Sequence, residues 1–148
     1  HTDSSAASDV YKRQGKMLLS PTRSYAPLLK KIFEKVGRNK INGIIHCTGG
    51  GQTKILHFID DLHIMKNNLF ETPPIFKIIM NESNTDPKEM YKVFNMGHRM
   101  EIYIHPDYAS DIIEISKSVG IDAKIIGEVL QSEKKKLSIQ SELGNFEY

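Results

Sequence analysis

Three consecutive glycines, Gly49 to Gly51, directly follow an isoleucine-rich run in this chain of 148 residues. A glycine inside a regular element costs roughly 0.5–1 kcal/mol relative to alanine, because its backbone loses more freedom on folding. A run of three therefore interrupts any helix or strand and predicts a turn that needs bare backbone. The residues before it, 41–47, predict a short buried strand, and the residues after it predict a short helix.

Hydrophobic periodicity and turn residues predict the other elements. Helices are expected from Ser24 to Gly37, in a proline-started segment within 70–80, from a cap at Thr85, and from Pro106 to Gly120. Strands are expected at 62–65, 99–105, 123–130 and 136–140, the last two joined by a charged turn. Apolar residues alternate along 99–105, so one face of that strand is expected in the core and the other outside it. This order predicts an α+β fold: a mixed, largely antiparallel sheet with helices packed on it in α/β/α layers.

Composition and charge argue against several classes of partner. The formal net charge is only +2, and no basic stripe is interleaved with aromatic residues, so no nucleic-acid partner is expected. No apolar run approaches the length of a membrane span, so no membrane partner is expected either. The single cysteine, Cys47, rules out an intramolecular disulfide framework and fits a cytoplasmic protein.

The glycine-rich turn is suited to binding an anion. A strand that enters such a turn and then a helix directs backbone N–H groups at a phosphate, and the hydroxyl of Thr48 can also donate. The spacing matches neither a Walker loop nor G-x-G-x-x-G. A purely structural turn, where two elements pack closely, therefore stays open as an alternative.

Two further stretches carry side chains suited to the same site. Arg23, next to Thr22 at a predicted helix start, has the planar fork that binds phosphate through two hydrogen bonds. Asn95 and Gly97 precede the 99–105 strand and indicate a bend beside a ligand. The alternatives are a surface ion pair for Arg23 and a simple turn for the other two.

A metal-binding site is the alternative to an anion-binding site. Its candidate ligands are His46, Cys47, His57 and His63. No C-x-x-C or H-x-x-x-H spacing organises these residues, so no metal site is predicted. A lone cysteine in a buried strand is expected to be inert packing rather than a nucleophile. His46 is a candidate for a polar contact to substrate, with a structural histidine as the alternative.

Taken together, these stretches resemble a known family. "LLSPTRSY" (18–25), "IIHCTGGG" (44–51) and "EMYKVFNMGHRM" (89–100) resemble, in this order, the carboxy-terminal half of phosphoribosylformylglycinamidine cyclo-ligase, also called aminoimidazole ribonucleotide synthetase. The resemblance runs from about Leu18 to Val129. Formylglycinamidine ribonucleotide synthetase and selenophosphate synthetase share the glycine loop more loosely, so a domain of such a relative stays an alternative.

The resemblance implies an ATP- and Mg²⁺-dependent ring closure in purine biosynthesis, from formylglycinamidine ribonucleotide to aminoimidazole ribonucleotide. In that reaction the formyl amide oxygen is phosphorylated, and a substrate nitrogen then expels phosphate. It also implies a homodimer, and an amino-terminal half that holds most ligands for ATP and the metal. The candidate residues for binding substrate or phosphate are Thr22, Arg23, His46, Thr48, Gly49, Gly50, Gly51, Asn95 and Gly97. No catalytic residue is assigned, and His98 departs from the small residues of some members.

The first residues are expected to be foreign to the family. The stretch from Ser4 to Gln14 has no apolar periodicity and matches the translation of a widely used sequencing adapter. We therefore expect 1–14 to be a disordered, non-native segment, and 15–148 to be the carboxy-terminal domain of a cyclo-ligase. This fragment is expected to lack activity by itself. A non-catalytic partner-binding module is the remaining alternative.

Overall fold

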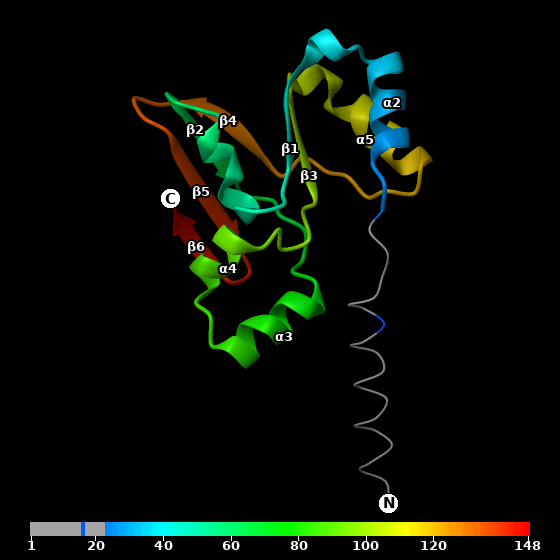
Figure 1. Ribbon diagram of the computed structural model, residues 1–148. Coiled ribbons are helices and arrows are strands. Elements are labelled where there is room, and N and C mark those ends of the chain that lie inside the picture. Colours follow the sequence, from blue (N-terminus) through cyan, green and yellow to red (C-terminus); the bar gives the residue numbers. More distant parts are fainter. Residues whose placement is uncertain (1–15, 17–22) are drawn as a thin grey trace, which may run out of the picture.

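The computed structural model describes Lys16 and residues 23–148 (Figure 1). The segment 1–14 and the candidate Thr22 lie outside the described residues. The helices are α2 (Ala26–Lys35), α3 (Pro74–Ser83), α4 (Pro87–Val93) and α5 (Ala109–Ser118), with the 3₁₀ helices η1 (Arg38–Lys40), η2 (Gly51–His57) and η3 (Pro106–Tyr108). The strands are β1 (Ile41–His46), β2 (Leu62–Lys66), β3 (Met100–Ile104), β4 (Gly127–Gln131), β5 (Lys136–Ser141) and β6 (Gly144–Glu147).

The strands form two sheets. β1 and β3 pair antiparallel, and the second sheet has the order β4-β2-β5-β6, in which only β2 and β5 are parallel. The α+β class with mixed, largely antiparallel pairing is thus confirmed, although the strands do not form one continuous sheet. The last two predicted strands, joined by the charged turn, do not pair with each other as neighbours. β2 lies between β4 and β5, and the charged connection passes the beginning of β2, where Ser132 N–H donates to Asp61 O at 3.2 Å.

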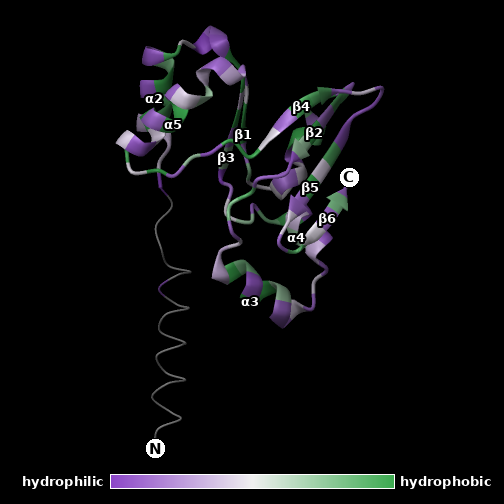
Figure 2. Cartoon of the chain, turned by 180° about the vertical axis from the view of Figure 1, so that it is seen from behind, coloured by the Kyte–Doolittle hydropathy of each residue, from purple (hydrophilic) through white to green (hydrophobic). Residues whose placement is uncertain are grey.

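Two hydrophobic cores flank the β1–β3 pair. Helices α2 and α5 lie side by side in Figures 1 and 2 and pack Leu28, Ile32, Ile112 and Ile115 against one face of the pair. The second core lies between η2, α4, β2 and β5. Because it covers the other face of β3, Glu101 on that face is buried and only 6% exposed. The expectation that this face lies outside the core was therefore wrong.

Prolines and short polar residues set the helix ends around α3 and α4. Pro74 and Pro87 stand in the first turns, where the missing N–H does no harm. The side chain of Asp86, rather than the expected Thr85, caps α4 by accepting from Lys88 N–H at 2.8 Å. Helix α3 lies at the edge of the molecule in Figure 1, and Figure 2 shows hydrophobic residues along much of its length. Within the described residues, no helix combines the length and apolar character needed to cross a membrane.

The β1–β3 pair brings two distant sequence motifs to the same end of the sheet. Antiparallel pairing places the end of β1 beside the beginning of β3, with His46 opposite Met100. The pairing continues one step further, because Cys47 N–H donates to Arg99 O at 2.9 Å. Residues 48–51, called here the glycine turn, follow β1, and residues 95–98, called the asparagine turn, precede β3.

Candidate functional site

The glycine turn has an uncommon backbone. Gly49, Gly50 and Gly51 all have left-handed φ angles, of 54°, 86° and 47°. Side chains other than glycine adopt this region at a cost. Successive backbone N–H groups in turn conformations form concavities that bind anions. This run of left-handed glycines is therefore suited to an anion.

The three glycines are needed for different reasons. Gly51 is buried, and a Cβ there would lie 2.7 Å from Tyr91 O and closer still to Phe94 O, so η2 could not approach the end of α4. A Cβ on Gly50 would make only ordinary contacts, the nearest at 3.6 Å from Lys54 Cβ. A Cβ on Gly49 would meet nothing within 4 Å. Close packing therefore explains Gly51, whereas the backbone at Gly49 is open to solvent.

A lysine holds the entrance of the turn. The ammonium of Lys54 donates to His46 O at 3.0 Å and to Thr48 O at 2.9 Å. It fixes a positive charge beside the exposed end of the turn. Within the described part of the chain, neither the N–H groups of Gly49 and Gly50 nor the hydroxyl of Thr48 donates a hydrogen bond. Lys54 was not predicted as a site residue, although its position three residues after the last glycine is a usable signal.

The asparagine turn is built by its own residues. Asn95 Oδ1 accepts from Gly97 N–H at 2.9 Å, and Asn95 O accepts from His98 N–H at 2.9 Å. Met96 and Gly97 have φ angles of 50° and 97°. A Cβ on Gly97 would lie 2.9 Å from the ring of Pro73. The side-chain oxygen of Asn95 and the bare backbone of Gly97 thus shape this turn.

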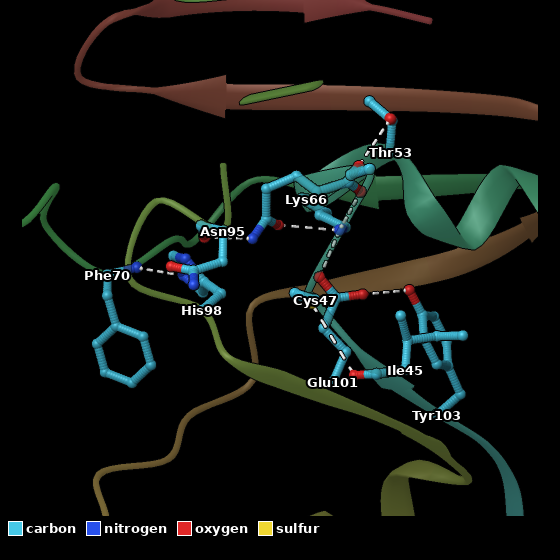
Figure 3. A network of polar contacts seen from close by, with 11 residues as sticks. Ile45, Cys47, Thr53, Lys66, Phe70, Asn95, His98, Glu101 and Tyr103 are labelled. Carbon is cyan, nitrogen blue, oxygen red and sulfur yellow. Dashed lines mark hydrogen bonds and ion pairs between the residues drawn. The ribbon is translucent and has the colours of Figure 1, made fainter. Parts of the chain in front are cut away.

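A buried polar network joins the two turns (Figure 3). Gln52 Nε2 donates to Asn95 O at 2.7 Å, and Gln52 O and Oε1 accept from Lys66 Nζ at 2.9 and 3.0 Å. Lys66 also pairs with Glu101, whose second oxygen accepts from the Tyr103 hydroxyl at 2.7 Å. The side chains of Lys66 and Glu101 are 2% and 4% exposed. Burial, and then the charge of Glu101, raises the pKa of Tyr103. This network was not predicted from the sequence.

His98, the last residue of the asparagine turn, is a buried hydrogen-bond acceptor. Its Nε2 accepts from Phe70 N–H at 2.9 Å, so in the neutral ring the proton is on Nδ1. Nδ1 is buried and has no hydrogen-bond partner among the described residues. Burial, followed by the charge of Lys66, lowers the pKa of His98 from 6.5 to about 4. At neutral pH, His98 is therefore an uncharged anchor for the segment between β2 and α3.

The candidate metal-binding side chains do not lie together. Cys47 is buried, and burial followed by the charge of Glu101 raises the pKa of its thiol from 9.0 to about 12. His63 Nε2 shares a hydrogen bond of 2.8 Å with Ser138 Oγ, and His46 is exposed at the end of β1. In residue 16 and residues 23–148, no three histidine, cysteine or acidic side chains gather as metal ligands would.

The remaining candidate, Arg23, has a partner elsewhere. Its Nη1 donates to Gly120 O, just beyond α5. The structure thus brings together the glycine turn, His46 and the asparagine turn, whereas the described contact of Arg23 is with Gly120.

Comparison with protein families gives a match over most of the chain. A family model described as "AIR synthase related protein, C-terminal domain" matches residues 1–140. The curated phosphoribosylformylglycinamidine cyclo-ligase of Methanococcus vannielii is 38% identical over 112 residues, covering 76% of this chain and 31% of that protein. The protein of that name from Methanopyrus kandleri is 36% identical over 112 residues, with the same shares. In Pseudothermotoga lettingae the identity is 34% over 131 residues, covering 86% and 37%. The chain thus spans about a third of the length of these relatives.

Solved structures share the fold. The crystal structure of E. coli HypE, a hydrogenase maturation protein, matches with a TM-score of 0.56 and 19% identity, covering 76% of this chain and 35% of that chain. A chain from the crystal structure of a HypE–HypF complex matches with a TM-score of 0.60 and 23% identity, covering 92% and 46%. At these identities the likeness concerns the fold alone.

Proposed function

Because this chain belongs to the AIR synthase related family, whose C-terminal domain it matches, we propose that it is part of a phosphoribosylformylglycinamidine cyclo-ligase. Within that enzyme, its glycine turn would hold a phosphate group of the substrate or of ATP. The chain spans about a third of its curated relatives, so ring closure is proposed for a protein that also contains their remaining part.

The observation that carries this proposal is that part of the glycine turn is exposed and has hydrogen-bond donors left unpaired by the described residues. Gly49 and Thr48 are exposed, and the N–H groups of Gly49 and Gly50 have no partner among the described residues. The ammonium of Lys54 donates to His46 O, at the end of β1, and to Thr48 O, in the turn. Unpaired N–H groups beside a fixed positive charge favour a phosphate oxygen, which can accept several hydrogen bonds at once.

The donors at this site fit a phosphate better than a metal ion. The turn offers N–H, hydroxyl and ammonium groups, all of which donate, whereas Mg²⁺ binds oxygen ligands such as carboxylates. ATP would supply the phosphoryl group that activates the formyl amide oxygen. We place the Mg²⁺ ligands, and the contacts of the proposed homodimer, mainly in the part of the enzyme that lies outside this chain.

The chain's own contribution would be to bind and orient the substrate. Holding a phosphate group at one end reduces the freedom of the reacting groups, which lowers the entropic part of the barrier. His46 is exposed beside the turn and is proposed to contact a polar group of the substrate. Arg23 has further guanidinium donors besides the one that contacts Gly120, and stays a candidate for a phosphate contact.

Two proteins test this proposal: this chain, and a longer one that carries the amino-terminal part of the relatives. We expect the longer protein to convert formylglycinamidine ribonucleotide with ATP and Mg²⁺, and this chain to bind the ribonucleotide without turnover. A longer protein that binds neither compound would favour a partner-binding module. Turnover of selenide or of a glutamine-dependent substrate instead would place the chain in a related member of the superfamily.

A further inference from the structure

Lys66 lies where a charged side chain is costly. The residue is 1% exposed, and its ammonium donates to Glu101 Oε1, to Gln52 O and to Gln52 Oε1. These bonds use all of its protons. A buried ion pair of this kind often gives no more stability than apolar residues of the same volume. Stability alone is therefore a weak reason for a lysine and a glutamate here.

The partners of Lys66 come from separate parts of the fold. Lys66 ends β2 of the four-stranded sheet, and Glu101 lies in β3 of the two-stranded sheet. Gln52 directly follows Gly51, and its Nε2 donates to Asn95 O in the asparagine turn. One ammonium thus connects both sheets and, through a single glutamine, both turns (Figure 3).

We propose that Lys66 and Glu101 are positioning residues of the anion site. Acting through Gln52, they fix the glycine turn relative to the asparagine turn and so set the direction of the Gly49 and Gly50 N–H groups. This inference rests on the proposed function, since it takes the glycine turn to be the place where a phosphate binds.

Glycine needs such external support, because it has little conformational preference of its own. The entrance of the turn is held by Lys54 through His46 O and Thr48 O, and the exit is held by Gln52. Without the Lys66 ammonium, two buried oxygens of Gln52 lose their donor. Unpaired buried oxygens are costly, so the end of the glycine turn would shift towards water. The N–H groups of Gly49 and Gly50 would then move with it.

The decisive variant is Lys66→Met combined with Glu101→Gln. Both buried charges are removed at similar side-chain volume, and the Tyr103 hydroxyl keeps an acceptor. The matched control is Lys136→Met, which removes the lysine of an exposed ion pair with Glu147, 2.8 Å long, in the same sheet as Lys66.

Inorganic phosphate is titrated into the 148-residue chain, and its binding is followed by the amide resonances of Gly49 and Gly50.

Hydrogen exchange without phosphate provides a second readout. It is measured at the Thr53 amide, which donates to Gly50 O, and at the His98 amide, which donates to Asn95 O. In the double variant we expect about tenfold weaker phosphate binding, comparable to the loss of a hydrogen bond to a charged group. We also expect faster exchange at both amides, with exchange in β5 unchanged. The Lys136→Met protein should behave as the unmodified chain in both measurements.

A folded double variant with unchanged phosphate affinity and unchanged exchange at both amides overturns the inference. If that variant does not fold, Gln52→Leu takes its place, since it removes only the side-chain bonds to Lys66 and Asn95. If the unmodified chain does not bind phosphate, the proposed anion site fails. The exchange comparison then still decides whether Lys66 and Glu101 hold the two turns together.

Discussion

Gly51 packs against the backbone of Tyr91 so closely that a Cβ on the glycine would lie 2.7 Å from the tyrosine's carbonyl oxygen. Non-bonded carbon and oxygen atoms do not approach this closely, so a side chain at this position would force the backbone to shift. The contact joins η2 to α4, and therefore the glycine turn to the segment that leads into the asparagine turn. The last of the three glycines thus belongs to the core.

Gly51→Ala should therefore destabilise the protein strongly. The methyl group would press against two backbone carbonyls, and alanine would also hold a left-handed φ of 47°. Overpacking of a core typically costs about 1–3 kcal/mol, and the left-handed backbone adds roughly 1 kcal/mol. The measurement is the free energy of unfolding by urea. A change below about 0.5 kcal/mol, the size of an ordinary surface substitution, would contradict the close packing.

Gly49→Ala should separate binding from stability. A Cβ there meets nothing within 4 Å, so stability should fall only by the cost of a left-handed alanine, roughly 1 kcal/mol. The methyl group would nevertheless stand on the exposed end of the turn and obstruct an anion. Gly120→Ala is the control, because Gly120 also has a left-handed φ, of 69°, and open space around its missing Cβ.

Both alanine variants should lose similar stability, and only Gly49→Ala should weaken phosphate binding, as measured by calorimetry on folded protein. Equal binding by the two variants would mean that Gly49 serves only the shape of the turn. The same comparison applies to Gly50→Ala, whose added carbon would make only ordinary contacts with Lys54.

The sequence predicted the elements whose signals are local. Proline in a first turn located α3 and α4, and alternation located β3. The burial of Glu101 was missed because alternation assigns a charged residue to the solvent side, whereas its partner Lys66 is 35 positions away. The separation of β4 from β5 was missed for the same reason: nothing near Ser132 shows that β2 inserts between these two strands. The strand β6 was missed because it has only four residues.

The candidate site was predicted in part. Glycine and asparagine mark turns by their own chemistry, so both motifs were found. Their meeting through Gln52 depends on the antiparallel pairing of β1 and β3, which no local pattern determines. Lys54 went unnoticed because a lysine in a short helix ordinarily faces water. Its hydrogen bonds to two carbonyls depend on the left-handed glycines that precede it.

His98 should make stability depend on pH below neutrality. Its pKa in the folded protein is about 4, below the ordinary 6.5, so the unfolded chain binds the proton more readily. The neutral ring therefore contributes stability that is complete above pH 6.5 and is lost as the pH falls towards 4. Between about pH 7 and pH 4.5 this loss should be on the order of 2 kcal/mol.

The measurement is urea unfolding of the unmodified chain and of His98→Gln across that pH range. Glutamine offers an acceptor to Phe70 N–H and does not titrate, so the variant should lose less stability on acidification. Parallel pH profiles would show that the acid sensitivity comes from other groups.

Cys47 should be unreactive in the folded protein. The side chain is 2% exposed, and its pKa is raised to about 12, so very little thiolate is present or accessible. Iodoacetamide at about pH 8 should label the native chain far more slowly than the urea-unfolded chain, as followed by intact mass. Labelling of native protein at the unfolded rate would contradict the burial of this thiol.

The anion site itself is tested most directly by titrating inorganic phosphate into this chain while recording amide resonances at constant ionic strength. We expect saturable shifts centred on Gly49, Gly50 and the neighbouring Lys54, with no comparable change from an equal ionic strength of chloride. Shifts that are absent from these amides, or that chloride reproduces, would contradict the claim that the glycine turn holds a phosphate group.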